Sequence, residues 1–425
     1  MAVNHRGETA FPQKTDLASR HTTHRGGKGE PFHDWYPYLE GFSPEFVKHV
    51  LAEYMPAARL IIDPFAGTGT TPVVLSSLGL DCGYCEVNPA MQLVVEAKMS
   101  VGKLPAFDRA VLAKQLVALS EDLPKRVAEA APDGQLEKSY KANFDGSIFF
   151  SPVAYRGLLG LRTVVDTLAA ENGLLAHLLT ISVMSKIVIC SNLKRSGDVR
   201  YKTQKELAKG VPDILPEVAK HLLVIANDCR TSLELKGNAT LLTANAKQLN
   251  LVKLILADGV ITSPPYLNGT NYFRNTKLEL WFARFLTTDI GLRAYRDQAI
   301  TSGINDVAAA QGRVHVNELV RSLVAELSAD TYDQRIPRMV AGYFEDMNLV
   351  LQGLAKNCRP GASICIDIGD SRYAGVHVPT HDILAHIGES LGLEHLGTTH
   401  LRTRLSKDKS PLSQSLVVLR KPLKC

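Results

Sequence analysis

The sequence lacks the features that would place it in several special classes of protein. Only seven cysteines occur among 425 residues, and this odd, scattered count predicts no disulfide framework and favours a reducing compartment. The best apolar run, 181–190, is short and contains Lys186, so no membrane span is predicted. Residues 1–30 form a polar tail without the apolar core of a signal peptide. We therefore expect a cytoplasmic protein.

A strong charge of one sign is also missing. The chain carries 48 Lys and Arg against 43 Asp and Glu, a net charge of +5, which permits a nucleic-acid partner without requiring one. With 45% hydrophobic residues the chain can bury a real core, which excludes wholesale disorder. Its length suits two or three domains, or one large α/β core with insertions.

A pair of cysteines has the spacing of a zinc or redox site. Cys82 and Cys85 lie in DCGYCEV, which is typical of a β-strand. Residues three apart on a strand point to opposite faces, so the two thiols cannot converge on one ligand. We interpret them as buried strand thiols rather than as a metal site.

The first half of the chain alternates strands and helices. An aromatic segment at 32–42 precedes a predicted helix at 43–55, with Ser43 as its N-cap and Pro44 at its first position. A strand at 59–65, a Gly- and Thr-rich turn and a helix at 71–79 follow. A second strand and helix at 81–101 complete the βαβ pattern of a parallel sheet.

The rest of the chain continues this sheet after a long interruption. Residues 102–237 have helical periodicity, whereas strand patterns return at 239–246, 257–266, 362–370 and 414–421. We expect an α/β fold with a doubly wound, mostly parallel sheet and a largely helical insertion. The halves of the core are then 31–101 and 238–425, the second with a polar insertion at about 286–335.

The first motif, DPFAGTGTT at 63–71, lies at the carboxyl end of a predicted strand and opens a helix. Ligands of open α/β sheets bind at such loops, and glycines let the backbone approach them. A phosphate-binding P-loop would need Lys where Thr70 stands, and a dinucleotide fingerprint would need Gly where Pro72 stands. The remaining interpretation is a nucleoside without phosphate, with Glu86 accepting both ribose hydroxyls; S-adenosylmethionine is such a ligand.

The second motif, TSPPY at 262–266, also follows a predicted strand. A proline-rich turn is one interpretation. The other is amino-group chemistry, since the lone pair of an exocyclic amino group is delocalised into its ring. Acceptors such as the Ser263 hydroxyl and the Pro264 carbonyl favour a pyramidal, nucleophilic nitrogen, and two prolines preorganise them. Tyr266 can stack on a base that has left its helix.

Together the two motifs resemble those of the amino-methylating DNA methyltransferases, the second in its cytosine-N4 form. Further similarity lies in HDWYPYLEGFSPEF at 33–46, an additional cofactor element, in EVNP at 86–89, the ribose motif, and in CRPGA at 358–362. The resemblance implies the sheet of S-adenosylmethionine-dependent methyltransferases. It covers 31–100 and 238–425, and the helical insertion resembles nothing that we can name.

This resemblance assigns roles to individual residues. The implied catalytic residues are Ser263, Pro264, Pro265 and Tyr266. The implied cofactor-binding residues are Tyr38, Asp63, Phe65, Gly67, Gly69, Thr70, Glu86, Asn245 and Thr262, with Asn245 standing where the family has an Asp beside the adenine. Adenine-N6 methylation stays open, because many cytosine-N4 members place the catalytic motif first, whereas here the cofactor motif comes first. No Pro-Cys dipeptide occurs, so C5 methylation of cytosine lacks its nucleophile.

The expected partner is double-stranded DNA, with a cognate restriction endonuclease as a further candidate and the bacterial or archaeal nucleoid as the place of action. A basic cluster in a predicted loop of the helical insertion suits phosphate contacts; with Arg274 it gives the candidate DNA-binding residues Lys194, Arg195, Arg200, Lys202 and Arg274. A second cluster comprises Arg402, Arg404, Lys407 and Lys409. A non-catalytic regulator that binds the cofactor and DNA is the alternative outside enzymes. No metal site is predicted.

Overall fold

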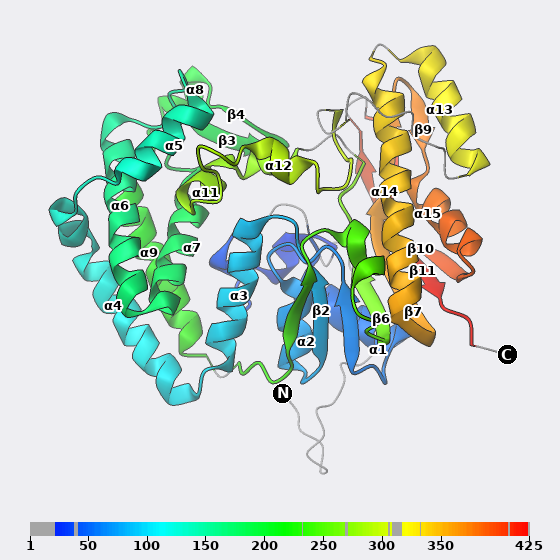
Figure 1. Cartoon of the computed structure of the whole chain (residues 1–425), viewed down its shortest axis with the longest axis horizontal. Helices are drawn as coiled ribbons and strands as arrows, with labels where there is room; N and C mark the ends of the chain where they lie inside the picture. The colour runs from blue at the N-terminus through cyan, green and yellow to red at the C-terminus, as the bar shows by residue number, and fades with distance from the viewer. Residues whose placement is uncertain are drawn as a thin grey trace.

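A central β-sheet with helices on both faces organises the protein (Figure 1). The computed structural model describes residues 22–37, 41–231, 233–267, 271–304, 307, 317–331, 333–406 and 409–423. The strands are Leu60–Asp63 (β1), Asp81–Cys85 (β2), Leu193–Ser196 (β3), Asp198–Tyr201 (β4), Ala239–Thr243 (β5), Ala257–Thr262 (β6), Cys358–Gly369 (β7), Ser371–Tyr373 (β8), Val376–Val378 (β9), Glu394–Leu405 (β10) and Pro411–Arg420 (β11).

Helices make up most of the remaining structure. The α-helices are Pro44–Tyr54 (α1), Thr70–Ser77 (α2), Pro89–Lys103 (α3), Ala106–Glu129 (α4), Gly134–Phe144 (α5), Pro152–Glu171 (α6), Gly173–Lys186 (α7), Gln204–Leu207 (α8), Ile214–Cys229 (α9), Tyr272–Asn275 (α10), Lys277–Phe282 (α11), Leu292–Arg296 (α12), Glu318–Asp330 (α13), Arg335–Asn357 (α14) and Thr380–Ser390 (α15). Short 3₁₀ helices are His24–Gly27 (η1), His33–Trp35 (η2) and Ala246–Leu251 (η3).

The main sheet has seven strands in the order β10-β11-β7-β6-β1-β2-β5. The neighbours from β7 to β5 are parallel, whereas β11 is antiparallel to both β7 and β10. In this sheet β11 alone therefore runs against the others. The predicted doubly wound, mostly parallel fold is confirmed.

Alternating side chains divide the core between the two faces of the sheet. Ile61 packs with α1, α2 and α3, whereas its neighbour Ile62 packs with α14 and α15. Cys82 and Cys85 divide in the same way, and both are buried. The interpretation of these two cysteines as buried strand thiols on opposite faces is therefore confirmed.

The start of helix α1 shows how local sequence sets an element. Ser43 accepts a hydrogen bond from the Phe46 amide at 3.4 Å, and Pro44 occupies the first turn. The predicted cap is therefore confirmed. Phe46, Val50 and Leu51 recur at helical spacing and are all buried.

Residues 102–237 form a helical lobe beside the sheet, at the left of Figure 1. Helices α4, α6, α7 and α9 pack on one another there. The segment predicted as a basic loop is instead a hairpin, in which β3 and β4 pair antiparallel around Gly197. Gly197 has φ +75°, which allows the tight reversal. The two strands have four residues each, too short for a clear period of two.

Strand β10 is absent from the sequence-based expectation, which placed Arg402 and Arg404 between strands. It is an edge strand whose side chains are mostly exposed or half-buried, so it lacks the apolar alternation by which strands are recognised. Lys407 of the second basic cluster lies outside the described residues. Across the described segments, every helix is too short or too polar to cross a membrane.

Candidate active site

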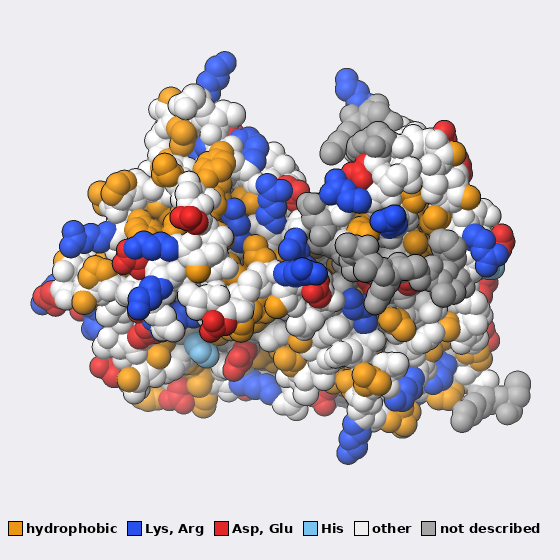
Figure 2. Space-filling model, turned by 45° about the horizontal axis from the view of Figure 1, so that its top comes forward, with side chains coloured by type: hydrophobic (Ala, Val, Ile, Leu, Met, Phe, Trp, Pro, Cys, Tyr) orange, Lys and Arg blue, Asp and Glu red, His pale blue; other side chains and the backbone are white. Residues whose placement is uncertain are grey.

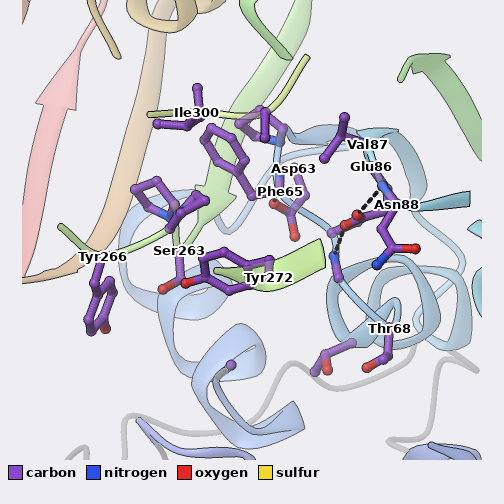
Figure 3. Close-up of a pocket in the computed structure, with 18 of the residues that line it drawn as sticks. Asp63, Phe65, Thr68, Glu86, Val87, Asn88, Ser263, Tyr266, Tyr272 and Ile300 are labelled. Carbon is purple, nitrogen blue, oxygen red and sulfur yellow. Dashed lines mark hydrogen bonds between the residues drawn. The ribbon is translucent and has the colours of Figure 1, made fainter. Parts of the chain in front are cut away.

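Two loops meet at the carboxyl edge of the sheet, where the strand order reverses. Strand β1 leads to β2 on one side, whereas β6 lies on its other side. Ligands of open α/β sheets bind at this switch point. A cavity of about 290 Å³ opens here and is lined by residues of both loops, including Gly67 and Ser263 (Figure 3).

Asp63, the last residue of β1, ties the two loops together. Its carboxylate accepts from the Phe65 amide at 3.0 Å and from the Thr262 hydroxyl at 2.7 Å. Thr262 is the last residue of β6, so one buried carboxylate joins the ends of neighbouring strands. Burial raises the pKa of Asp63 to about 6, although its hydrogen bonds oppose the shift. Asp63 and Thr262 thus fix the edge from which both loops depart.

The two glycines of the first motif have different roles. Gly67 lines the cavity with φ +54°, so it suits the predicted close approach of a ligand. Gly69 has φ +86°, and a Cβ there would lie 2.9 Å from a methyl carbon of Val95 on α3. Gly69 is therefore required by packing behind the loop. Phe65 and Thr70 line the cavity with Gly67.

Glu86 follows β2 and faces the cavity. Its two carboxylate oxygens accept from the amides of Gly67 and Asn88, each at 2.8 Å, drawn as dashed lines in Figure 3. Each oxygen keeps capacity for a further donor, so the carboxylate can also bind two vicinal hydroxyls. Burial raises the pKa of Glu86 to about 7, against the lowering effect of the amides.

A buried lysine supports the same loop from behind. Lys98 on α3 is 2% exposed and donates its ammonium to the carbonyl of Thr68 at 2.8 Å. Thr68 itself lines the cavity. Burial lowers the pKa of Lys98 to about 7, whereas the charges of Asp228 and Asp34 oppose this shift. Motif-based reasoning missed Lys98, because a single lysine in a helical pattern gives no signal.

All four residues of the Ser263–Tyr266 loop line the cavity. Pro264 is buried, whereas the other three are half-buried. Tyr266 packs under the guanidinium of Arg404, whose central carbon lies 5.0 Å from the ring centroid. Gly369 at the end of β7 leaves room for this pair, since a Cβ there would meet both Arg404 and Tyr266. Burial raises the pKa of Tyr266 above its ordinary value.

The remaining wall comes from segments far apart in sequence. Tyr272, Phe273 and Asn275 line the cavity, and Asn245, at the start of η3, lines it as well. Thr22 and Thr23 also contribute, although the sequence assigned them to a polar tail. Tyr38 lies outside the described residues. Asp367 also lines the cavity, although the sequence analysis did not name it as a site residue. Its position near the end of a predicted strand was the signal that could have identified it.

The predicted DNA-binding cluster lies on the β3–β4 hairpin and is held by internal contacts. Arg195 lines the cavity and forms an ion pair with the fully buried Glu279. Lys194 and Arg200 both pair with Glu206, at 2.7 and 2.8 Å. Lys202 donates to the carbonyls of Ile189 and Ser191 at 2.9 and 2.6 Å.

Arg195 connects the hairpin to the cavity wall. It donates to the Tyr36 hydroxyl at 3.0 Å, and that hydroxyl donates to Glu279 at 2.9 Å. Arg274 of α10 is exposed and does not line the cavity. The structure thus brings Arg195 to the site and leaves Arg274 on the surface. Across the described segments, no group of three or more His, Cys, Asp or Glu side chains is placed to hold a metal ion.

Similar proteins place this site in context. A Type II methyltransferase, M.BsoBI of Geobacillus stearothermophilus, is 23% identical over 94% of this chain and 86% of its own length. M.AvaI of Nostoc sp. is 23% identical over 88% of this chain and 82% of its own. The chain is thus similar to Type II methyltransferases over most of its length. These relatives confirm the resemblance to DNA methyltransferases, and with it S-adenosyl-L-methionine as the cofactor.

The other comparisons add less. M.MjaII of Methanocaldococcus jannaschii is 33% identical over 67 residues, 16% of this chain and 13% of its own. No family model matches the sequence. Among solved structures, an rRNA methyltransferase of Streptomyces viridochromogenes aligns with 91% of this chain and 87% of its own at 9% identity. Its TM-score is 0.30.

Proposed function

We propose that the protein is a site-specific DNA methyltransferase that transfers the methyl group of S-adenosyl-L-methionine to the N4 amino group of a cytosine extruded from duplex DNA. The observation that carries this proposal is the shared cavity, in which the Ser263–Tyr266 loop faces the Gly67 and Glu86 side. The similarity to Type II methyltransferases supports the same class.

The cofactor side offers groups that match a nucleoside. The free acceptor capacity of Glu86 suits the two ribose hydroxyls, and Phe65 and Asn245 are available to the adenine. The backbone at Gly67 allows close approach of the methionine end. When bound, S-adenosyl-L-methionine supplies an electrophilic methyl group on a positively charged sulfur. These residues hold the donor while the loop after β6 holds the acceptor.

The catalytic side activates the amino group. The Ser263 hydroxyl and the Pro264 carbonyl accept its two N–H bonds, so its lone pair points at the methyl carbon. The new N–CH₃ bond forms as the S–CH₃ bond breaks in line, and the bonding pair returns to sulfur as a neutral thioether. The nitrogen then releases one proton to water. Positioning supplies much of the rate, and Tyr266 provides the stacking surface for the base.

DNA must deliver the target from outside. A base inside a duplex cannot reach this loop, so the nucleotide is extruded at a cost of about a few kcal/mol. Figure 2 shows a hollow between the two lobes, with Lys and Arg side chains on both rims. We assign duplex binding to this hollow and sequence recognition to the helical region 102–237. A cognate restriction endonuclease of the same specificity is the partner that a Type II methyltransferase implies.

Methylation of unmodified DNA tests the proposal. Bacteriophage DNA grown in a host without DNA methyltransferases is incubated with the protein and S-adenosyl-L-methionine carrying a labelled methyl group. The DNA is then digested to nucleosides for mass spectrometry, and an undigested sample is sequenced for modified bases. We expect N4-methylcytosine at one short sequence.

The other outcomes decide against parts of the proposal. N6-methyladenine as the sole product would replace the cytosine assignment by the adenine alternative, which the order of the two motifs favours. No incorporation into DNA, while S-adenosyl-L-methionine still binds in a titration, would favour a non-catalytic regulator. The Ser263→Ala variant serves as the matched control, because it removes one acceptor and leaves the cofactor side intact.

A further inference from the structure

Three neighbouring strands build a polar relay on the base side of the cavity. The Gln414 amide on β11 donates to both carboxylate oxygens of Asp367 on β7, at 2.7 and 3.0 Å. Arg402 on β10 in turn donates its Nε to the Gln414 carbonyl oxygen at 2.6 Å. Asp367 and Gln414 are each 1% exposed. The relay therefore fixes one edge of the Arg402 guanidinium from buried groups.

The two arginines of β10 are engaged differently. Arg404 lies over Tyr266 and donates to the Asp370 carbonyl at 2.9 Å. Arg402 also lines the cavity. Within the described part of the chain, neither a hydrogen bond nor an ion pair is recorded for its two terminal nitrogens. An oriented guanidinium thus presents unpaired donors to the space beside the Ser263 loop.

Strand register places these groups across from the amino-binding loop. Thr262 pairs with Ile366, so Ser263 follows beside Asp367. Arg402 pairs with Gln414, which pairs with Gly369, two residues further along β7 than Asp367. Three strand spacings and an offset of two residues separate the backbones of Ser263 and Arg402 by roughly 16 Å. Arg402 and Ser263 line the same cavity, and the stacked pair of Tyr266 and Arg404 lies between their strands.

Cytosine matches this arrangement better than adenine does. Beyond its amino group, cytosine offers two adjacent acceptors, N3 and O2, and a guanidinium donates to such a pair in a bidentate manner. Adenine offers N1 at the equivalent place, but a C–H group stands where cytosine has O2. A base that leaves one arm of a positioned guanidinium unpaired is strongly disfavoured.

We propose that Arg402 reads N3 and O2 of the extruded cytosine and thereby selects cytosine over adenine. Gln414 and Asp367 are positioning residues that orient its guanidinium. This inference rests on the proposed function, because it takes cytosine as the target of the Ser263 loop. It adds a specificity-determining residue on a strand that carries no recognised motif.

Methyl transfer to a short duplex containing the mapped site tests the inference. The variants are Arg402→Met and, as a matched control, Arg420→Met, which removes an arginine at the opposite end of the same strand pair. We expect kcat/KM to fall on the order of 10- to 100-fold for Arg402→Met, and to stay within about twofold for Arg420→Met. Melting curves establish that both variants are folded.

A modified target base isolates the contact. In a second duplex the target is 3-deaza-2′-deoxycytidine, which has C–H in place of N3. We expect this change to cost the wild type about tenfold more in kcat/KM than it costs Arg402→Met. Gln414→Met, which releases the guanidinium, is expected to reduce the same penalty. Equal penalties in the wild type and Arg402→Met would overturn the inference.

A phosphate contact by Arg402 is the competing explanation. In that case Arg402→Met would weaken binding of a duplex with an abasic target as much as it weakens binding of the cytosine duplex. This result would also overturn the inference. Failure of the proposed function has another signature, since the wild type itself would then form no N4-methylcytosine. The two failures are therefore distinguishable.

Discussion

The two sides of the cavity are held in place by different kinds of hydrogen bond. On the cofactor side the hydrogen bonds involve backbone groups, because Glu86 accepts hydrogen bonds from two backbone amides and Lys98 donates one to a backbone carbonyl. The base side is organised by side chains from three strands, among them Arg402. Backbone contacts suit a ligand that is always the same, whereas side chains can discriminate between bases. Substitutions on the two sides should therefore affect different steps.

Removal of the Ser263 hydroxyl should have the largest effect. Ser263→Ala deletes one acceptor for the target amino group, and kcat is expected to fall about 10²- to 10³-fold. The dissociation constant of S-adenosyl-L-methionine should stay unchanged, because the cofactor side is untouched. Single-turnover kinetics and a calorimetric titration measure the two quantities. Unchanged methyl transfer would remove Ser263 from the catalytic residues.

Glu86→Ala should produce the opposite pattern on the cofactor side. It removes both ribose acceptors and leaves the amides of Gly67 and Asn88 unpaired. We expect the affinity for S-adenosyl-L-methionine to fall on the order of 100-fold. Calorimetry with Glu86→Gln, which keeps one carbonyl acceptor, should give an intermediate value. Equal affinity of Glu86→Ala and wild type would contradict the assignment.

Glu86 should also make cofactor binding depend on pH. Burial raises its pKa to about 7, so the carboxylate is protonated as the pH falls through that value, and the charged acceptors for the ribose are lost. Affinity should therefore decrease from pH 8 to pH 6. The change should be much smaller in Glu86→Gln, which does not ionise. Parallel pH profiles of the two proteins would assign the dependence to another group.

Lys98→Met should have a smaller effect on the same side. The replacement has a similar length but leaves the Thr68 carbonyl without its buried donor. We expect S-adenosyl-L-methionine to bind about tenfold more weakly, with kcat at saturating cofactor little changed. A titration beside a melting curve separates this effect from loss of folding. A fall in kcat alone would show that Lys98 does not support the cofactor loop.

The smallest effect should come from the hairpin surface. Glu206 pairs with Lys194 and Arg200, so Glu206→Gln should free both cations for phosphates and strengthen DNA binding about two- to fivefold at low salt. Glu217→Gln, which breaks a surface pair with Lys220 on α9, is the control. Weaker DNA binding by Glu206→Gln would indicate that Glu206 supports the hairpin structurally.

The sequence predicted the elements whose patterns are local. The β1–α2–β2–α3 order and the loops at 63–71 and 262–266 follow from hydrophobic runs that end in Gly and Pro. The β3–β4 hairpin and β10 were missed, because short or solvent-facing strands give little periodicity. The relay from Asp367 to Arg402 could not be predicted, since it depends on register among three strands.

The second lesson concerns charge. From the sequence we predicted one DNA-binding cluster that includes Lys194, Arg195, Arg200 and Lys202. The sequence does not show which groups of the same chain pair with these side chains. Glu279 lies 84 residues from its partner Arg195, and Glu206 lies 12 residues from its partner Lys194. A basic cluster in a sequence therefore gives the number of cationic side chains, but it does not indicate which of them are available to DNA.

The contact between Arg195 and Glu279 has a consequence for exchanging specificity between relatives. Because this buried pair and Tyr36 join the hairpin to helix α11 and to the cavity wall, the hairpin cannot be transplanted alone. A chimaera that replaces 190–203 without its partner segment at 271–283 would strand a carboxylate in the protein interior. The hairpin and the segment at 271–283 would therefore have to be exchanged together.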